Sequence, residues 1–300
     1  MRFGRVYRFI AGKENDAIEV QPPFQIEFDI NKTPSESPNV SRVRIYNLAP
    51  ETRKMLEKPD LRCELHAGYS EEDGALLMLA GAIVDGYSYH DGPDIVTELG
   101  IYDGWIELRD TAISISYGKG TDAHTVIRAI ARAMSLPLIM ADDVPNIAWK
   151  SGFSFYGSAH SALHKACAAA GLEWSIQNQA IQVVQINGRT QREAIVLQAD
   201  GGLIGYPERT RRGAIEKARV QDQRTGNYVE LTSAQQQRDG WRVRSLLLPQ
   251  INPGDTLILR SAEVDEICRA DEVRHTGNFY DGDWATDMLL VSDERYADTE

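Results

Sequence analysis

The chain has 300 residues, of which 44 are acidic and 32 are basic, so its formal net charge at pH 7 is −12. This balance argues against a protein that binds the nucleic-acid backbone, because phosphate contacts require clustered lysine and arginine. Hydrophobic residues make up 42% of the chain and charged residues 25%, the composition of a globular protein with room for two or three domains.

Neither a membrane protein nor a disulfide-stabilised protein is indicated. The longest uncharged apolar run covers residues 75–84, whereas a membrane-spanning helix needs about 20 such residues. The basic N-terminus has no apolar core of signal-peptide length. The three cysteines, Cys63, Cys167 and Cys268, are far apart and lack the paired spacing of a zinc site. We therefore expect synthesis in a reducing cytoplasm and no membrane insertion.

Residues 1–112 predict a β domain. Apolar and polar side chains alternate over 24–30 and 40–46, the pattern of strands with one solvent-exposed face. Turn sequences at 70–74 and 90–94 separate further strands, which we expect over 62–69, 76–90 and 94–104. Five or six antiparallel strands of this kind form a small barrel or sandwich.

One short helix interrupts these strands in the sequence YNLAPETRKML. Its expected N-cap, Ala49, has no side-chain oxygen and forgoes a cap worth about 1 kcal/mol. Pro50 at the first helical position and Glu51 beside the positive helix end partly compensate.

Residues 113–190 change to an α/β pattern. Apolar residues from Ala123 to Met134 have helical spacing, with Thr121 as the expected N-cap and Pro137 beyond the end. The following segment reads strand, helix, strand, strand. We expect Ser158 to cap its helix and Gly171 to end it.

Residues 191–300 return to β structure, with a type II turn expected at Pro253-Gly254. The region also resembles the first β domain. RVRIYNLAPE (42–51) and RVRSLLLPQI (242–251) have the same order of features, as do segments 84–99 and 273–289. This order predicts a duplicated β domain on either side of the α/β module.

Two histidines could suggest a metal site. His160 and His164 lie four residues apart on a predicted helix, the spacing of a zinc-binding pair. The glutamate of the HExxH motif is missing and no third ligand is evident. A solvated helix face is therefore the preferred interpretation, and a metal site is the alternative.

Two groups of aspartates could supply acid–base pairs or bind a cation: Asp142 with Asp143, and Asp281 with Asp283 and Asp287. Asp-Gly-Asp between strands is more typical of a turn, and residues 281–287 lack the terminal glutamate of a calcium loop. The GxSxG motif is absent, and residues 116–122 have the glycines of a phosphate loop without its spacing. The five tryptophans are scattered, which favours core anchoring. The sequence thus predicts a non-enzymatic protein with no catalytic, cofactor-binding or metal-binding residues.

The segment PNVSRVRIYNLAPET (38–52), followed by Ala67-Gly68-Tyr69, resembles baseplate hub proteins of contractile-tailed phages. These are the Mu-like hubs and the late-control protein D family, distantly related to the hub part of type VI secretion spike proteins. GLIGYPERT (202–210), VRSLLLPQINPGDTLILRS (243–261) and VRHTGNFYDGDW (273–284) extend the similarity in the same order. Asn278 stands where the family usually has aspartate.

The resemblance implies a mainly β (α+β) protein with two tube-type antiparallel β-barrels flanking a small α/β module. It further implies a homotrimer whose six barrels form a ring of approximate sixfold symmetry. Such a ring would join a hexameric tail-tube ring to a trimeric central spike and contact other baseplate proteins. DNA would cross its channel without specific binding, helped by an acidic lining. The protein would act in the virion tail baseplate after assembly in the bacterial host cytoplasm.

Two other functions stay open. A cell-wall hydrolase would use an Asp or Glu pair, for example one that includes Asp283 or Asp143. A glycan-binding β module of the tail tip would stack sugars on the scattered tryptophans.

Overall fold

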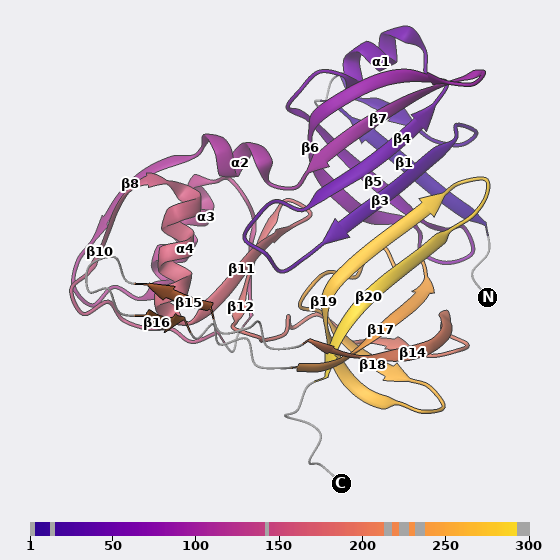
Figure 1. Ribbon diagram of the computed structural model, residues 1–300. Coiled ribbons are helices and arrows are strands. Elements are labelled where there is room, and N and C mark those ends of the chain that lie inside the picture. Colours follow the sequence, from indigo (N-terminus) through magenta and orange to yellow (C-terminus); the bar gives the residue numbers. More distant parts are fainter. Residues whose placement is uncertain are drawn as a thin grey trace.

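The computed structural model describes residues 4–12, 16–141, 144–212, 218–221, 228–231 and 238–292. Within them the protein is mainly β, and most strand pairs are antiparallel. Two β units lie one beside the other, and a small α/β module lies next to both (Figure 1).

The N-terminal β unit is the part of the chain before the α/β module. Its strands pair in the order β3-β4-β7-β6-β5-β1-β2. Every second side chain of β3 is buried, as the alternating sequence predicts. Ile26, Phe28 and Ile30 therefore enter a core shared with β1, β5 and β6. The elements of this unit are β1 (Arg5–Ala11), β2 (Ile18–Val20), β3 (Ile26–Lys32), β4 (Val40–Tyr46), α1 (Pro50–Leu56), β5 (Leu61–Tyr69), β6 (Gly74–Asp91) and β7 (Asp94–Tyr102).

Helix α1 forms as the sequence predicts. Ala49 is the N-cap residue and its side chain makes no capping hydrogen bond. Pro50 and Glu51 occupy the first turn. Leu56, at the last helical position, is fully buried in the core of the unit. The turn and helix that follow β4 thus cover one end of that core.

The α/β module contains the predicted strand–helix–strand–strand segment, with Ser158 as N-cap and Gly171 after the last turn. The predicted N-cap of the preceding helix, Thr121, is wrong: Asp122 caps it and accepts a hydrogen bond from the amide of Thr125. A carboxylate is the stronger acceptor for this amide. The sequence pattern missed α2, β8 and β9. The elements are α2 (Trp105–Asp110), β8 (Ala112–Tyr117), α3 (Ala123–Ala133), β9 (Leu138–Met140), β10 (Phe153–Ser158), α4 (Ala159–Ala170), β11 (Leu172–Gln177) and β12 (Ala180–Gln185).

The C-terminal β unit follows the module. The expected turn at Pro253-Gly254 is present: the amide of Asp255 donates to the carbonyl of Asn252, and Gly254 has φ +89°. The strands of the unit are β13 (Ile195–Leu197), β14 (Leu203–Arg212), β17 (Arg238–Leu246), β18 (Thr256–Arg260), β19 (Asp265–Asn278) and β20 (Trp284–Ser292). A separate hairpin is formed by β15 (Ala218–Gln221) and β16 (Tyr228–Leu231).

The two β units share one order of strand pairing. The N-terminal unit has the order β3-β4-β7-β6-β5-β1, and the C-terminal unit has β14-β17-β20-β19-β18-β13. The long strands β6 and β19 occupy equivalent places in this order, and each has a bulge. The bulge lies between Ile83 and Asp85 in β6 and between Ala270 and Glu272 in β19. The internal repeat predicted from the sequence is therefore present in the strand pairing.

The expected closed barrels do not form among the described strands. The C-terminal half of β19 pairs with β3, from Val273 opposite Lys32 to Asn278 opposite Glu27. This pairing occupies an edge of each unit and merges both into an open sheet of 13 strands. Figure 1 shows β3 running alongside β19 where the units meet. Sequence periodicity identifies strands but not their neighbours, so it could not distinguish one merged sheet from two barrels.

No helix within the described ranges combines the length and apolar character needed to span a membrane.

Candidate interaction surface

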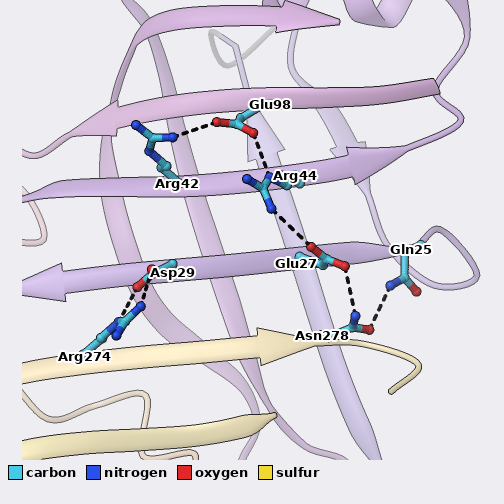
Figure 2. Close-up of polar contacts among 8 residues, drawn as sticks. All are labelled: Gln25, Glu27, Asp29, Arg42, Arg44, Glu98, Arg274 and Asn278. Carbon is cyan, nitrogen blue, oxygen red and sulfur yellow. Dashed lines mark hydrogen bonds and ion pairs between the residues drawn. The ribbon is translucent and has the colours of Figure 1, made fainter. Parts of the chain in front are cut away.

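One side of the merged sheet carries a row of charged residues, which we call the charged face. Because side chains alternate along a strand, residues next to the buried apolar ones point to the opposite side. The charged face crosses from β7 through β4 and β3 to β19 (Figure 2) and continues over β20 and β17. Its residues are Glu27, Asp29, Arg42, Arg44, Glu98, Arg244, Arg274, Asp283 and Asp287.

Glu98 of β7 holds both arginines of β4. Its carboxylate accepts from Arg44 Nε at 2.7 Å and from Arg42 Nη1 at 3.0 Å. The Glu98 side chain is only 6% exposed. Burial alone would raise the pKa of Glu98, but the hydrogen bond and the positive charge of Arg44 outweigh burial, and the pKa lies below its usual value. Glu98 therefore stays ionised at neutral pH.

Asp29 and Arg274 join the two β units. Arg274 of β19 donates from Nε and Nη2 to the two carboxylate oxygens of Asp29 on β3, at 2.8 and 2.7 Å. These hydrogen bonds hold the pKa of Asp29 below its usual range. The pair is partly exposed, so it contributes at most about 1 kcal/mol to stability. The bidentate geometry of the pair instead helps to fix the register of β19 on β3.

Asn278 uses both ends of its side-chain amide at the same junction. Its Nδ2 donates to Glu27 at 3.0 Å, and its Oδ1 accepts from Gln25 Nε2 at 2.8 Å (Figure 2). The backbone amides of Tyr280 and Asp281 also point to Oδ1. An aspartate could not donate to Glu27, which explains the asparagine at this position.

The aspartate run after β19 serves the C-terminal unit. Asp283 and Asp287 lie 2.7 and 3.6 Å from the guanidinium of Arg244. Asp281 accepts from the backbone amide of Gly282 at 2.6 Å, the turn role expected for Asp-Gly. In register, Arg244 lies opposite Asp287, as Arg44 lies opposite Glu98. The charged face is therefore duplicated together with the fold.

A buried polar cluster lies where the three parts of the chain meet. Lys32 of β3 donates to Asn252 at 2.8 Å, and the backbone amide of Asn252 donates to Asp255. Asp255 also accepts from Thr190 Oγ1 at 2.5 Å. Burial lowers the pKa of Lys32 to about 7, although Asp103 and Asp255 act against this. A single lysine at the end of a strand gave no sign of this role in the sequence.

Asp103 ties the N-terminal unit to the α/β module. It accepts from the backbone amides of Asn178 and Gln179 at 2.6 and 2.9 Å. Burial raises the pKa of Asp103 to about 6. The sequence reasoning placed the Asp-Gly pair at 103–104 at the end of a strand and did not find this contact.

The two histidines do not converge on one point. Nδ1 of His164 lies 2.7 Å from a carboxylate oxygen of Glu36, whereas the His160 ring stacks edge-to-face on Trp174. No group of three or more His, Cys, Asp or Glu residues able to hold a metal occurs in the described part of the chain. Asp142 and Asp143 lie outside the described residues.

The fold is shared with solved phage tail proteins. Superposition on the 43 kDa tail protein of prophage MuSo2 from Shewanella oneidensis gives a TM-score of 0.62 at 10% identity, covering 95% of this chain and 96% of that one. A tail protein from Neisseria meningitidis MC58 gives 0.62 at 12% identity, covering 97% of each chain.

A type VI secretion protein has the same fold. The E. coli c3393 protein, a component of that system with structural similarity to T4 tail proteins gp27 and gp5, gives a TM-score of 0.59 at 10% identity. The alignment covers 91% of this chain and 75% of that one. No protein-family model and no curated protein sequence matches the chain. The similarity therefore lies in the fold.

Proposed function

We propose that the protein is the structural hub of the baseplate in a phage or phage-like tail. In this proposal it is a non-enzymatic homotrimer in the virion, assembled in the bacterial host cytoplasm. It contacts the tail-tube ring on one side, a trimeric central spike on the other, and further baseplate proteins around it. Residues 1–112, 113–190 and 191–300 form its three domains. The fold shared with phage tail proteins and with a type VI secretion component supports this assignment.

The observation that carries the proposal is the duplicated strand order. The two β units have the same sequence of strand partners and the same bulge position. Three chains with two such units each would present six similar surfaces around an axis. A trimer could then form six similar contacts with a hexameric ring and still bind a threefold spike, because closed rings join where their interfaces match in number.

The arrangement of layers supports a channel through this ring. The charged face belongs to the layer that runs without interruption through both units, β6-β7-β4-β3-β19-β20-β17-β14. The second layer is divided between β5-β1 in one unit and β18-β13 in the other. In a ring, a continuous layer suits the inner radius and a divided layer suits the outer radius. In this proposal the continuous layers of the three copies surround the channel, and the charged face lines it.

The proposed lining lets DNA pass without retention. The chain as a whole is acidic, with a net charge of −12. On the charged face, the carboxylates of Glu98, Asp29 and Asp287 hold Arg44, Arg274 and Arg244. An arginine already paired with a carboxylate gains little from a phosphate, so passing DNA finds repulsion and few free cations.

Native mass spectrometry of the full chain tests the proposal, alone and with candidate tail-tube and spike proteins. A trimer that binds one spike trimer and one tube hexamer supports it. A monomer under every one of these conditions overturns it. The rival functions predict different results: hydrolysis of peptidoglycan that is lost in Asp283→Asn, or glycan binding by the monomer.

A further inference from the structure

Among the strand edges that have no partner in the described part of the chain are those of β6 and β14 in the continuous layer. The first half of β6 pairs with β5 up to Ile83, and the second half then pairs with β7 alone. The end of α1 packs against Gly86, and no described strand pairs with the side of residues 87–91 that faces away from β7. At one end of the sheet, β14 pairs with β17 on one side only. Unpaired backbone amides and carbonyls along an edge are a template for another strand.

The equivalent edges are already paired inside the chain. By strand order and bulge position, β19 corresponds to β6 and β3 corresponds to β14. After its bulge, β19 leaves β18 and pairs antiparallel with β3. The internal β19–β3 joint thus shows what the open edges of β6 and β14 are shaped to do.

We infer that residues 87–91 of β6 in one copy pair antiparallel with residues 206–210 of β14 in a second copy of this chain. This inference rests on the proposed trimeric hub and specifies how its copies join. Each copy uses β6 on one side and β14 on the other, so the contact is head-to-tail and generates a closed ring when the rotation permits.

The internal joint also gives the register. In β19, Arg274 lies opposite Asn31 and Thr276 lies opposite Asp29. Tyr87 pairs with Glu98 on β7, and Arg274 pairs with Asp287 on β20. Glu98 in turn lies opposite Arg44, and Asp287 lies opposite Arg244 at the matching position of the second unit. Tyr87 is therefore the equivalent of Arg274.

The same alignment applies to the other edge. Asp29 faces Arg42 on β4, and Glu208 faces Arg242 on β17, so Glu208 is the equivalent of Asp29. Transferring the internal register places Tyr87 opposite Thr210 and Tyr89 opposite Glu208 of the neighbouring copy.

The side chains on the two edges fit this contact. Large exposed apolar side chains occur on both: Tyr87 and Tyr89 on β6 are 48% and 36% exposed, and Ile204 and Tyr206 on β14 are 41% and 77% exposed. Where the internal joint has the Arg274–Asp29 ion pair, the joint between copies places Tyr89 opposite the Glu208 carboxylate, while the Tyr87 hydroxyl hydrogen-bonds Glu98 of its own chain. A phenol donates to a carboxylate without adding charge, and pairing buries the rings.

Paired cysteines test the register in the full chain. Residues directly opposite in an antiparallel pair have Cβ atoms about 4.5–5.5 Å apart, close enough for a disulfide after small shifts. Tyr89→Cys combined with Glu208→Cys is expected to give covalent trimers on oxidation, because each chain then links to two neighbours. Cys63, Cys167 and Cys268 are buried and leave little background. Tyr89→Cys with Ile204→Cys, out of register, is the matched control and should stay uncrosslinked.

The outcomes separate this inference from the proposed function. Trimers in the native mass spectrum without crosslinks in Tyr89→Cys/Glu208→Cys overturn the edge pairing and leave the hub intact. Covalent dimers without trimers overturn the head-to-tail contact. Monomers throughout, even with tube and spike present, overturn both.

Charge changes at Tyr89 provide a second measurement. Tyr89→Glu places a carboxylate opposite Glu208 of the neighbouring copy and should weaken trimer formation about tenfold or more, whereas Tyr89→Arg places an opposite charge there and should retain the trimer. Tyr156→Glu, at an exposed position on β10 of the α/β module, is the control. Equal trimer formation by all three variants overturns the inference.

Discussion

Lys32 of β3 and Asn252 of the C-terminal β unit are joined by a hydrogen bond of 2.8 Å, and both side chains are buried. The contact lies beside the β19–β3 joint and draws in Asp255 and Thr190. A buried cation with a neutral partner is costly unless its surroundings are preorganised. The pair therefore makes the union of the two units sensitive to protonation.

Replacing Lys32 should change how stability depends on pH. The pKa of Lys32 is about 7 in the folded chain, against about 10.4 for an exposed lysine. Between these values the unfolded chain holds more protons, so the free energy of unfolding should increase as pH rises. Urea unfolding at several pH values between about 7 and 10 should show this increase in the wild type and lose most of it in Lys32→Met. The exposed Lys119→Met serves as control, and an unchanged slope in Lys32→Met would contradict the assignment.

Asp103 should act in the opposite direction at lower pH. Burial raises its pKa to about 6 in the folded chain, above about 3.9 for an exposed aspartate. In that interval the folded chain holds more protons, so stability should fall as pH rises. Asp103→Asn should flatten this part of the profile. It should also cost about 1–3 kcal/mol at neutral pH, because an amide group replaces one acceptor facing Asn178 or Gln179.

Gly277→Ala should loosen the joint between the units. A Cβ at this position would lie 2.1 Å from Cζ of the Phe28 ring, and this ring packs edge-to-face on Trp284. Overpacking of this kind costs about 1–3 kcal/mol, measurable as a lower denaturation midpoint. Gly118→Ala, where a Cβ would meet nothing within 4 Å, should be close to neutral. Equal effects of the two substitutions would show that the close approach at Gly277 is unimportant.

Ala49→Ser should stabilise the protein by about 0.5–1 kcal/mol, because it supplies the missing N-cap acceptor of α1. The gain should appear as a higher midpoint in thermal unfolding. Ser158→Ala provides the reciprocal comparison, since it removes an existing cap from α4 and should cost a similar amount. An unchanged midpoint in Ala49→Ser would mean that the backbone before α1 does not place the serine hydroxyl within reach of the helix amides.

Asn278→Asp should destabilise the β19–β3 joint at neutral pH by about 1–3 kcal/mol, because it removes the donor to Glu27 and adds a like charge. Lowering the pH below about 4 protonates such carboxyls and should reduce the difference from the wild type. Ser114→Asp, at an exposed position on β8, tests whether an added charge elsewhere has the same effect. A difference that does not depend on pH would contradict the electrostatic explanation.

Much of the fold follows from local chemistry that the sequence pattern indicates. The alternation of apolar and polar residues in FQIEFDI and VSRVRIY determined the strands and their buried sides. Successive side chains of a strand point to opposite sides, so a strand with one solvent-exposed side has polar residues at every second position. Ala49, Pro50, Ser158 and Gly171 determined where helices begin and end, because capping depends on adjacent backbone groups. The order of features in the two β regions also indicated the repeat, which the strand pairing contains.

Only the tertiary structure decided which strands are neighbours and which charges meet. The Arg274–Asp29 pair spans 245 residues and Lys32–Asn252 spans 220, so no local pattern could connect them. The merging of two expected barrels into one sheet likewise depends on the β19–β3 edge. Backbone hydrogen bonds at such an edge are the same for any sequence, and side-chain fit across the whole molecule selects the partner.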